Sequence, residues 1–381
     1  MENTKTVRQL EVVNKWVSND HKGTLIATTG FGKTYTAILA AEQIKPVSMI
    51  VVVPTLILKD QWLKELDKSK LENYQVYVIN TASKTQLDCE LLVLDECHTV
   101  PAVTFSEVFN TIKYEKIFCL TATIERADGN HDLIVSKAPI IDTITLDECL
   151  ANGWISPYTI YNLEVPFTAT EQLAYNKANN NFKFFAMKMG YGDTFGAAKN
   201  FLVNGTPEQK GWAGGYFNSM RARKACITNN TNKANITVDI INRFPNLYSI
   251  VFSESIKFAD EINALIPDIS VSIHSKMTAK KQREAMDVFK DGRTKKRVIA
   301  SCKALSAGLD LPQLSLGIIA SFNSSKLTST QTVGRIVRKQ EGKQAYIINL
   351  YTPDTQEMNW LNKKQFGVQN IKWIKSVKEI I

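Results

Sequence analysis

The sequence predicts an α/β protein with two parallel-sheet domains and a mainly helical insertion between them. Short apolar, β-rich runs alternate with helical stretches in both halves of the 381-residue chain, a pattern typical of parallel sheets covered by helices. The alternation stops at residues 171–235, which hold seven glycines and ten aromatic residues. We therefore expect domains at residues 1–145 and 236–381, with a linker and a helical insertion at residues 146–235.

The individual elements follow from the apolar runs and the stretches between them. In the first domain we expect strands at 24–28, 48–53, 91–94 and 116–120, and helices near 9–17 and after Lys33. In the second we expect strands at 249–252, 270–273, 297–300, 316–320 and 345–350, and helices at 257–265 and 279–289. A chain of this length is sufficient for about two or three domains with cores of their own.

The composition is that of a folded globular protein. Hydrophobic residues make up 44% of the chain and charged residues 22%, without a long low-complexity tract. No apolar run approaches the roughly 20 residues of a membrane-spanning helix, and the N-terminus lacks the order of a signal peptide. We therefore expect a cytoplasmic protein. The six cysteines form no Cys-x-x-Cys pair, which predicts reduced, buried thiols and no zinc site.

Positive charge is concentrated in the middle segment. The chain has a formal net charge of +9, and residues 171–235 contain nine Lys or Arg against three Asp or Glu. This segment is a candidate contact surface for the phosphates of a nucleic acid.

A phosphate-binding loop is expected at residues 27–34, ATTGFGKT. The loop follows a predicted strand and begins a predicted helix, which is the context that such a motif requires. Backbone N–H groups can surround the phosphates, Lys33 can reach the β and γ phosphates, and the Thr34 hydroxyl can bind Mg²⁺. The expected ATP contacts of the loop are Thr29, Gly30, Phe31, Gly32, Lys33 and Thr34.

Two acids follow the apolar run 91–94. Asp95 and Glu96 are expected at the carboxyl end of a buried strand, where open α/β sheets bind their ligands. With the upstream loop in place, we expect Asp95 to hold Mg²⁺ and Glu96 to orient and deprotonate the attacking water.

The order of the motifs resembles the superfamily 2 helicases. Asp95-Glu96-Cys97-His98 is followed by Thr121-Ala122-Thr123 and then by the segment 331–338, QTVGRIVR. The resemblance implies two RecA-like domains with ATP between them, and it implies that Arg335 and Arg338 of the second domain reach the γ-phosphate. His98, Thr121, Thr123 and Gln331 would couple the ATP site to the rest of the motor. From the residues alone, the two threonines could equally be ordinary strand-end hydroxyls, and His98 a core or capping residue.

Further motifs are assigned by the same resemblance. Gln9 matches a glutamine that reads adenine, although Thr6 stands where an arginine is usual. Pro54 and Thr55, with Gln61-Trp62, match a motif that grips a nucleic-acid strand. Gly308 and Asp310 match the motif that links ATP to nucleic acid, with Cys302 where threonine is frequent.

Within the superfamily, the sequence is similar to XPB-like DNA helicases and to phage branch-migration and fork-remodelling helicases. Arg126 and Asp128 match the outer residues of an Arg-Glu-Asp element, with Ala127 in place of the glutamate. The basic segment corresponds to a thumb-like insertion in that group. Arg221, Arg223 and Lys224 are the expected phosphate contacts, because no acid lies near them in the sequence. Most aromatic residues of the segment are expected in a small core.

The expected function is an ATP-dependent DNA helicase or translocase that uses ATP and Mg²⁺, acts on single-stranded or forked DNA, and works with other replication or recombination proteins. A bacterial or phage-infected cell is the expected source. Three alternatives remain open: an RNA helicase, a double-strand translocase that remodels DNA without unwinding it, and a clamp that does not hydrolyse ATP.

Overall fold

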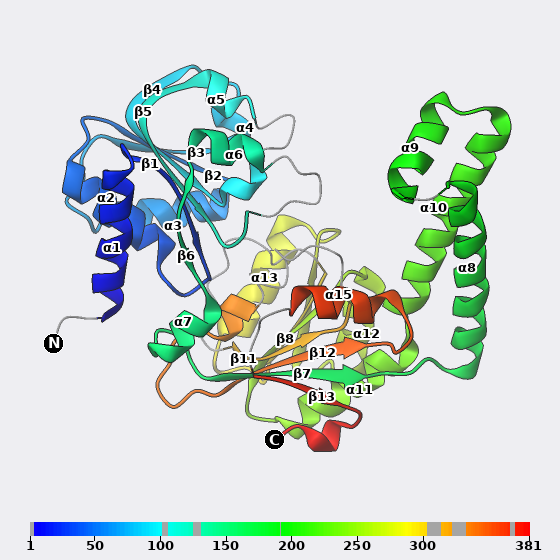
Figure 1. Cartoon of the computed structure of the whole chain (residues 1–381). Helices are drawn as coiled ribbons and strands as arrows, with labels where there is room; N and C mark the ends of the chain where they lie inside the picture. The colour runs from blue at the N-terminus through cyan, green and yellow to red at the C-terminus, as the bar shows by residue number, and fades with distance from the viewer. Residues whose placement is uncertain are drawn as a thin grey trace.

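The first domain is a six-stranded parallel sheet covered by helices (Figure 1). The computed structural model describes residues 4–100, 106–124, 131–190, 192–302, 314–321, 333–365 and 370–381. The strand order is β3-β2-β4-β5-β1-β6. The strands are β1 (Lys22–Ala27), β2 (Met49–Val53), β3 (Tyr74–Val78), β4 (Leu87–Asp95), β5 (Ile112–Thr121) and β6 (Ile140–Ile144). The helices are α1 (Thr4–Ser18), α2 (Lys33–Ile44), α3 (Leu56–Leu66), α4 (Ile79–Ala82), η1 (Cys97–Thr99), α5 (Val108–Thr111), α6 (Asp132–Lys137) and α7 (Leu146–Ala151).

The second domain is a seven-stranded parallel sheet with the order β13-β7-β12-β11-β8-β10-β9. Its strands are β7 (Tyr158–Glu164), β8 (Tyr248–Ser253), β9 (Ser270–His274), β10 (Val298–Cys302), β11 (Leu314–Ile319), β12 (Ala345–Tyr351) and β13 (Ile371–Ile374). Its helices are α11 (Thr231–Arg243), α12 (Ile256–Leu265), α13 (Ala279–Lys290), α15 (Gln356–Lys364) and η2 (Val377–Glu379). The α/β class with two parallel sheets is therefore confirmed.

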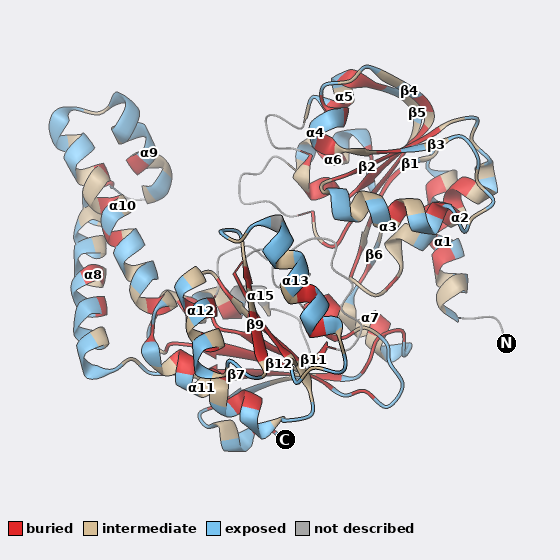
Figure 2. Cartoon of the chain, turned by 180° about the vertical axis from the view of Figure 1, so that it is seen from behind, coloured by how far each residue is buried: buried red, intermediate tan, exposed pale blue. Residues whose placement is uncertain are grey.

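Among the described residues the two sheets supply three large clusters of buried apolar side chains, and one of these clusters contains residues of both domains. The strands β2 and β10, each of which has a neighbour on both sides, are buried along their whole length, and Figure 2 shows buried strands in both domains. Strands buried on both faces have continuous apolar sequences, as in residues 49–53, MIVVV. Among the described residues, none of the helices combines the length and the apolarity needed to cross a bilayer.

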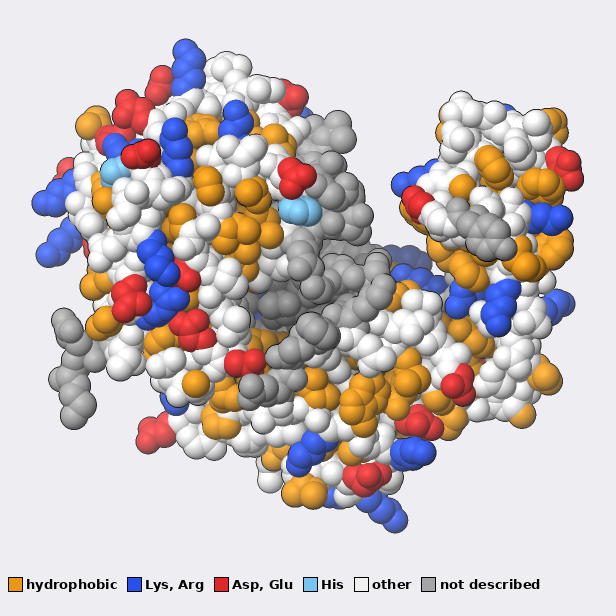
Figure 3. All heavy atoms as spheres, in the orientation of Figure 1, with side chains coloured by type: hydrophobic (Ala, Val, Ile, Leu, Met, Phe, Trp, Pro, Cys, Tyr) orange, Lys and Arg blue, Asp and Glu red, His pale blue; other side chains and the backbone are white. Residues whose placement is uncertain are grey.

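A helical hairpin stands apart from the two sheets. It consists of α8 (Ala169–Lys188), α9 (Thr194–Asn204) and α10 (Pro207–Thr228), and it projects from the second domain (Figures 1 and 3). Capping boxes at Thr168 and Thr206 begin its two long helices. A small core at its tip is formed by Met189, Ala198, Ala213 and Tyr216.

The segment expected to hold the linker and the insertion also contains a strand and the start of a helix of the second domain. β7, within residues 146–235, pairs with β12 and β13 in the second sheet, and α11 crosses the boundary expected at residue 236. The strand was not recognised because its partners lie far along the chain: Asn162 pairs with Asn349. The helical insertion itself therefore spans α8 to α10.

Candidate functional site: the junction of the two domains

The phosphate-binding loop joins β1 to α2 in the expected place. Gly30 and Gly32 have φ values of +102° and +94°, a backbone region that favours glycine. Gly32 is also the N-cap residue of α2, so the loop leads directly into the positive end of a helix dipole. Lys33 Nζ donates to its own loop at Ala27 O, 3.0 Å away. The ammonium group therefore lies over the loop, where a phosphate would compete for it.

Helix α1 supports this loop from the outside. Gln9 is buried, and its Nε2 donates to Phe31 O at 2.8 Å. One turn earlier, Lys5 Nζ donates to Gly30 O at 2.6 Å, and burial lowers the pKa of Lys5. The reading of adenine by Gln9 remains a prediction. Lys5 was not identified from the sequence, although its spacing of four residues from Gln9 puts both on one face of the helix.

The acidic pair is at the carboxyl end of β4. Asp95 ends the strand, and Glu96 has a left-handed φ of +49°. Asp95 Oδ2 accepts from Trp62 Nε1 at 2.8 Å, and its Oδ1 accepts from the Glu96 N–H at 2.9 Å. Burial and then the charge of Glu96 raise the pKa of Asp95 to about 6. The indole of Trp62 is a support for the acid that the sequence motif did not indicate.

His98 connects the acidic pair to the end of the next strand. Its Nδ1 lies 3.1 Å from Thr121 Oγ1 and 3.4 Å from Glu96 Oε2. Thr121 Oγ1 donates to Thr123 O at 2.6 Å. Because β4, β5 and β1 are neighbours in a parallel sheet, these groups meet the phosphate-binding loop at one edge. The predicted coupling residues of the first domain are thus brought together.

The donor set suits a nucleotide with a divalent cation. Asp95 is a buried carboxylate near the charge of Lys33, and Glu96 Oε2 is a buried oxygen that accepts no hydrogen bond. This oxygen lies 3.4 Å from the His98 ring nitrogen, and a buried carboxylate oxygen without a hydrogen bond is stabilised when a cation or a proton donor approaches it. Oxygen donors of this kind suit Mg²⁺, with the Thr34 hydroxyl as the second candidate ligand.

The second domain closes the site from the opposite side. Residues 333–336 are helical, and Gly334 lies so close to Thr29 that a side chain at position 334 would collide with it. Arg335 is buried, with 9% of its surface exposed. Arg338 forms an isolated antiparallel bridge with Ile155 of the interdomain linker. The segment that carries both predicted arginines therefore contacts the phosphate-binding loop.

Four predicted site residues lie outside the described part of the chain. They are Arg126, Gly308, Asp310 and Gln331. Their roles stay predictions.

The expected nucleic-acid contacts differ in their surroundings. Thr55, which follows Pro54, caps α3 by accepting from Leu58 N. In the insertion, Arg221 is exposed, whereas the Arg223 guanidinium lies over the Phe182 ring, 4.2 Å from its centre. No acid lies near these bases in the sequence, but the fold brings Glu254 to Lys224, with which it forms an ion pair. The acid belongs to the second domain and is distant in sequence, so a local pattern could not indicate it.

Comparisons with known proteins agree with this arrangement. Residues 4–90 match the family "Type III restriction enzyme, res subunit", and residues 232–340 match "Helicase conserved C-terminal domain". The "DNA 3'-5' translocase XPB2" of Sulfurisphaera tokodaii is 27% identical over 380 residues, which cover 91% of this chain and 81% of that protein.

Two solved structures share the fold. The helicase domain of Pyrococcus furiosus Hef superposes with a TM-score of 0.58 at 14% identity, over 95% of this chain and 98% of that one. The DNA-bound ATP-dependent type ISP restriction-modification enzyme LlaBIII gives a TM-score of 0.62 at 17% identity. That match covers 98% of this chain but only 31% of the enzyme.

Proposed function

We propose that this chain, an ATP-dependent helicase of superfamily 2, moves along DNA from 3′ to 5′ and separates or remodels strands at forked or branched sites. The direction is that of its relative from Sulfurisphaera tokodaii, a DNA 3'-5' translocase that aligns with 91% of the chain. The basic helical insertion supports a branched substrate, since it lies beside the motor and not within either sheet.

One observation carries the proposal: Gly334 lies against Thr29. The contact brings the arginine segment of the second domain onto the phosphate-binding loop of the first. A guanidinium supplied across a cleft stabilises the charge that develops on the transferred phosphate, and it makes hydrolysis depend on domain closure. We therefore assign transition-state stabilisation to Arg335 and Arg338.

The remaining roles in the reaction follow from the first domain. Lys33 would give up its hydrogen bond to Ala27 O and bind the β and γ phosphates instead. Glu96 would accept the proton of the attacking water. Thr34 and Asp95 would hold Mg²⁺, which neutralises phosphate charge when bound. The nucleotide-bound site would be coupled to the second domain through His98, Thr121 and Thr123. Gln9 would contact the adenine while it supports the loop at Phe31.

The test compares ATP hydrolysis and strand separation on single-stranded DNA, blunt duplex, a synthetic fork and the matching RNA substrates. We expect the fork to stimulate hydrolysis most, and partial duplexes with a 3′ tail to be unwound in preference to those with a 5′ tail. Stimulation by RNA alone would indicate an RNA helicase. Stimulation by blunt duplex without strand separation would indicate a double-strand translocase.

The variant Glu96→Gln separates a motor from a passive clamp. It keeps the size of the side chain but removes the base, so ATP should bind and turnover should fall by about a hundredfold or more. Turnover equal to that of the unmodified protein would contradict the proposed mechanism.

A further inference from the structure

Residues 154–156, which connect the two domains and are named here the bridging segment, are buried although they belong to a linker. The segment follows α7 and precedes β7. Ile155 and Ser156 have no exposed surface, and Trp154 is 7% exposed. Linkers ordinarily run over the surface, because their backbone polar groups need water or other partners. The partners of this linker are the two halves of the nucleotide site.

On one side the bridging segment contacts the phosphate-binding loop. The Trp154 ring packs on the ring of the buried Phe31, with 5.8 Å between their centres and 55° between their planes. Ile155 Cγ2 lies 3.1 Å from the position that a Cβ atom on Gly30 would take. Trp154 Nε1 also donates to Thr4 Oγ1 of α1 at 3.2 Å. Two consecutive side chains therefore pack against the loop that holds the phosphates.

On the other side the segment holds the main chain at the second predicted arginine. Ser156 N donates to Val337 O at 2.8 Å, and Ser156 Oγ donates to Arg338 O at 3.0 Å. The same hydroxyl accepts from Gln340 N at 3.0 Å. Ile155 completes the contact through its bridge with Arg338. The backbone on both sides of Arg338 is thus fixed by one buried serine.

We propose that Trp154, Ile155 and Ser156 are positioning residues that keep Arg338 in register with the phosphate-binding loop. The inference rests on the proposed function, in which Arg338 acts on the phosphates held by that loop. The three residues are consecutive and buried, so only two peptide bonds separate Trp154 on the phosphate-binding loop from Ser156 at Arg338. A movement of the loop on nucleotide binding would therefore also move Arg338. Nucleotide binding to the first domain therefore sets the position of Arg338 in the second domain.

The variants Ser156→Ala and Trp154→Ala test the two contacts separately. Ser156→Ala removes the hydroxyl but keeps the bond from Ser156 N to Val337 O. We expect kcat for ATP to fall about 10- to 100-fold with a nearly constant KM, because small misplacements of a catalytic group have effects of this size. Trp154→Ala loosens the loop, so it should mainly raise KM. The conservative variants Ser156→Thr and Trp154→Phe should restore most of each loss.

A binding readout avoids dependence on turnover. In the Glu96→Gln background, ATP should change the tryptophan fluorescence, and Trp154→Phe should reduce that change because Trp154 lies on the loop, leaving the part that comes from Trp62 beside Asp95. The matched control is Ser249→Ala, which removes another fully buried serine hydroxyl, one that donates to Leu247 O at 3.1 Å. Ser249→Ala should leave kcat and KM unchanged, and the melting temperature of every variant verifies its folding.

The outcomes separate this inference from the proposed function. If Glu96→Gln and Arg338→Ala abolish turnover while folded Ser156→Ala and Trp154→Ala retain wild-type kcat and KM, the positioning role is overturned and the function stands. If Ser249→Ala lowers kcat as much as Ser156→Ala, the effect of Ser156 is one of general stability and the inference is wrong. Wild-type turnover in Glu96→Gln would instead overturn the proposed function.

Discussion

At the residue scale, Trp62 gives the buried Asp95 carboxylate its side-chain hydrogen bond, 2.8 Å from Nε1 to Oδ2. A partner behind a metal ligand fixes the orientation of that ligand, and its loss typically lowers metal affinity or activity about 10- to 100-fold. We expect Trp62→Phe to raise the Mg²⁺ concentration that gives half-maximal ATP hydrolysis by about tenfold. The measurement is a Mg²⁺ titration of the hydrolysis rate at saturating DNA.

Trp16→Phe is the control for this substitution. Trp16 is also buried, and its Nε1 donates at 2.9 Å to Ile117 O, which lies on β5 opposite Lys22, the first residue of β1. Both variants lose one buried indole donor, but only Trp62 touches a candidate metal ligand. Equal Mg²⁺ requirements in the two variants would contradict the assigned role of Trp62.

The protonation of Lys343 makes the free energy of unfolding depend on pH. Its Nζ donates to Arg338 O at 3.2 Å, and burial together with the charge of Arg338 lowers its pKa from 10.5 to about 8. Between these two values the unfolded chain binds more protons than the folded one, so the Lys343 contribution to stability rises with pH in this window. Below pH 8 the Lys343 ammonium stays charged in the folded protein, so the full cost of burying that charge lowers the stability.

Lys343→Met should therefore change the pH dependence of unfolding. The stability of the variant relative to wild type should be most favourable at pH 7 and should decline as the pH rises through 8 toward 10. Urea unfolding at several pH values measures this difference. A difference that stays constant from pH 7 to 10 would show that Lys343 does not titrate in the folded protein over this range.

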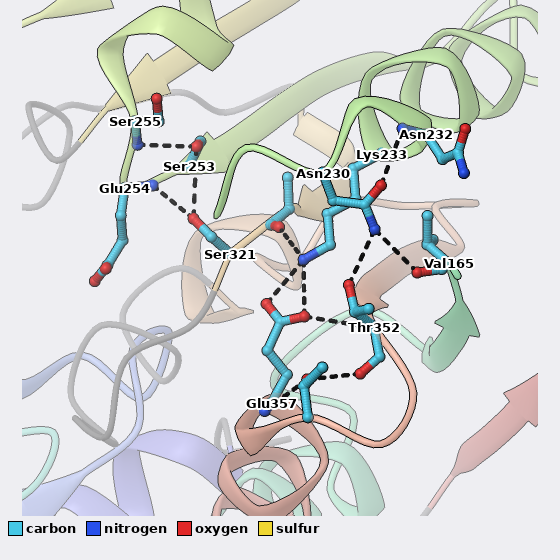
Figure 4. A network of polar contacts seen from close by, with 12 residues as sticks. Val165, Asn230, Asn232, Lys233, Ser253, Glu254, Ser255, Ser321, Thr352 and Glu357 are labelled. Atoms are coloured by element: carbon cyan, nitrogen blue, oxygen red, sulfur yellow. Dashed lines mark hydrogen bonds and ion pairs between the residues drawn. The ribbon is translucent and has the colours of Figure 1, made fainter. Parts of the chain in front are cut away.

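At the element scale, a buried polar network joins α11, at the base of the insertion, to the second sheet (Figure 4). The Lys233 ammonium donates to both carboxylate oxygens of Glu357 at 2.8 Å and to Ala320 O at 2.9 Å. Neither side chain of the ion pair is exposed. Asn230 Nδ2 donates to Val165 O at 3.1 Å, so the two ends of the insertion are also held together.

Glu357→Gln should destabilise this base. Burial lowers the pKa of Lys233 and raises that of Glu357, so each group depends on the other for its charge. Removing one partner of a buried pair typically costs about 3–5 kcal/mol, whereas replacing both by apolar residues is often neutral. The free energy of unfolding from urea titration should fall by this amount in Glu357→Gln and recover in Lys233→Met/Glu357→Leu. Equal losses in the single and the double variant would argue against an unpaired charge as the cause.

The elements also show what the sequence can and cannot predict. The loop at residues 27–34 and the pair Asp95-Glu96 lie where the motifs indicated, because each motif is a short local pattern that follows a strand. β6, with the sequence IIDTI, was missed because only one of its five residues is buried. The bond from Ser156 to Arg338 spans 182 residues, and no local periodicity carries such information. The contacts of the linker were therefore beyond what a local pattern could indicate, whereas the approach of Arg335 and Arg338 to the first domain was expected from the family resemblance alone.

At the scale of the whole molecule, the helical hairpin is attached to the motor at one end only. Its tip has its own small core around Met189, Ala198, Ala213 and Tyr216. Exposed apolar side chains surround that core: Phe184, Met187, Phe195, Leu202 and Val203. Figure 3 shows hydrophobic side chains interspersed with basic ones on the hairpin. A unit with a separate core and a closed base can be changed without disturbing the sheets.

Cutting the hairpin above its base tests whether it determines the substrate. Phe182 of α8 and Arg223 of α10 lie side by side, 4.2 Å from guanidinium to ring centre, so a short Gly-rich turn can replace residues 184–221. This truncation keeps the ion pair between Lys224 and Glu254. We expect the melting temperature of the two-sheet body and the DNA-independent ATP hydrolysis to remain close to wild type, because Trp154, Arg338 and the loop are untouched. Strand separation on a fork should fall at least about tenfold, since several phosphate and stacking contacts, each worth about 1–3 kcal/mol for a stacked base, would be lost. Undiminished separation by a truncated protein of wild-type stability would mean that the sheets alone select the substrate.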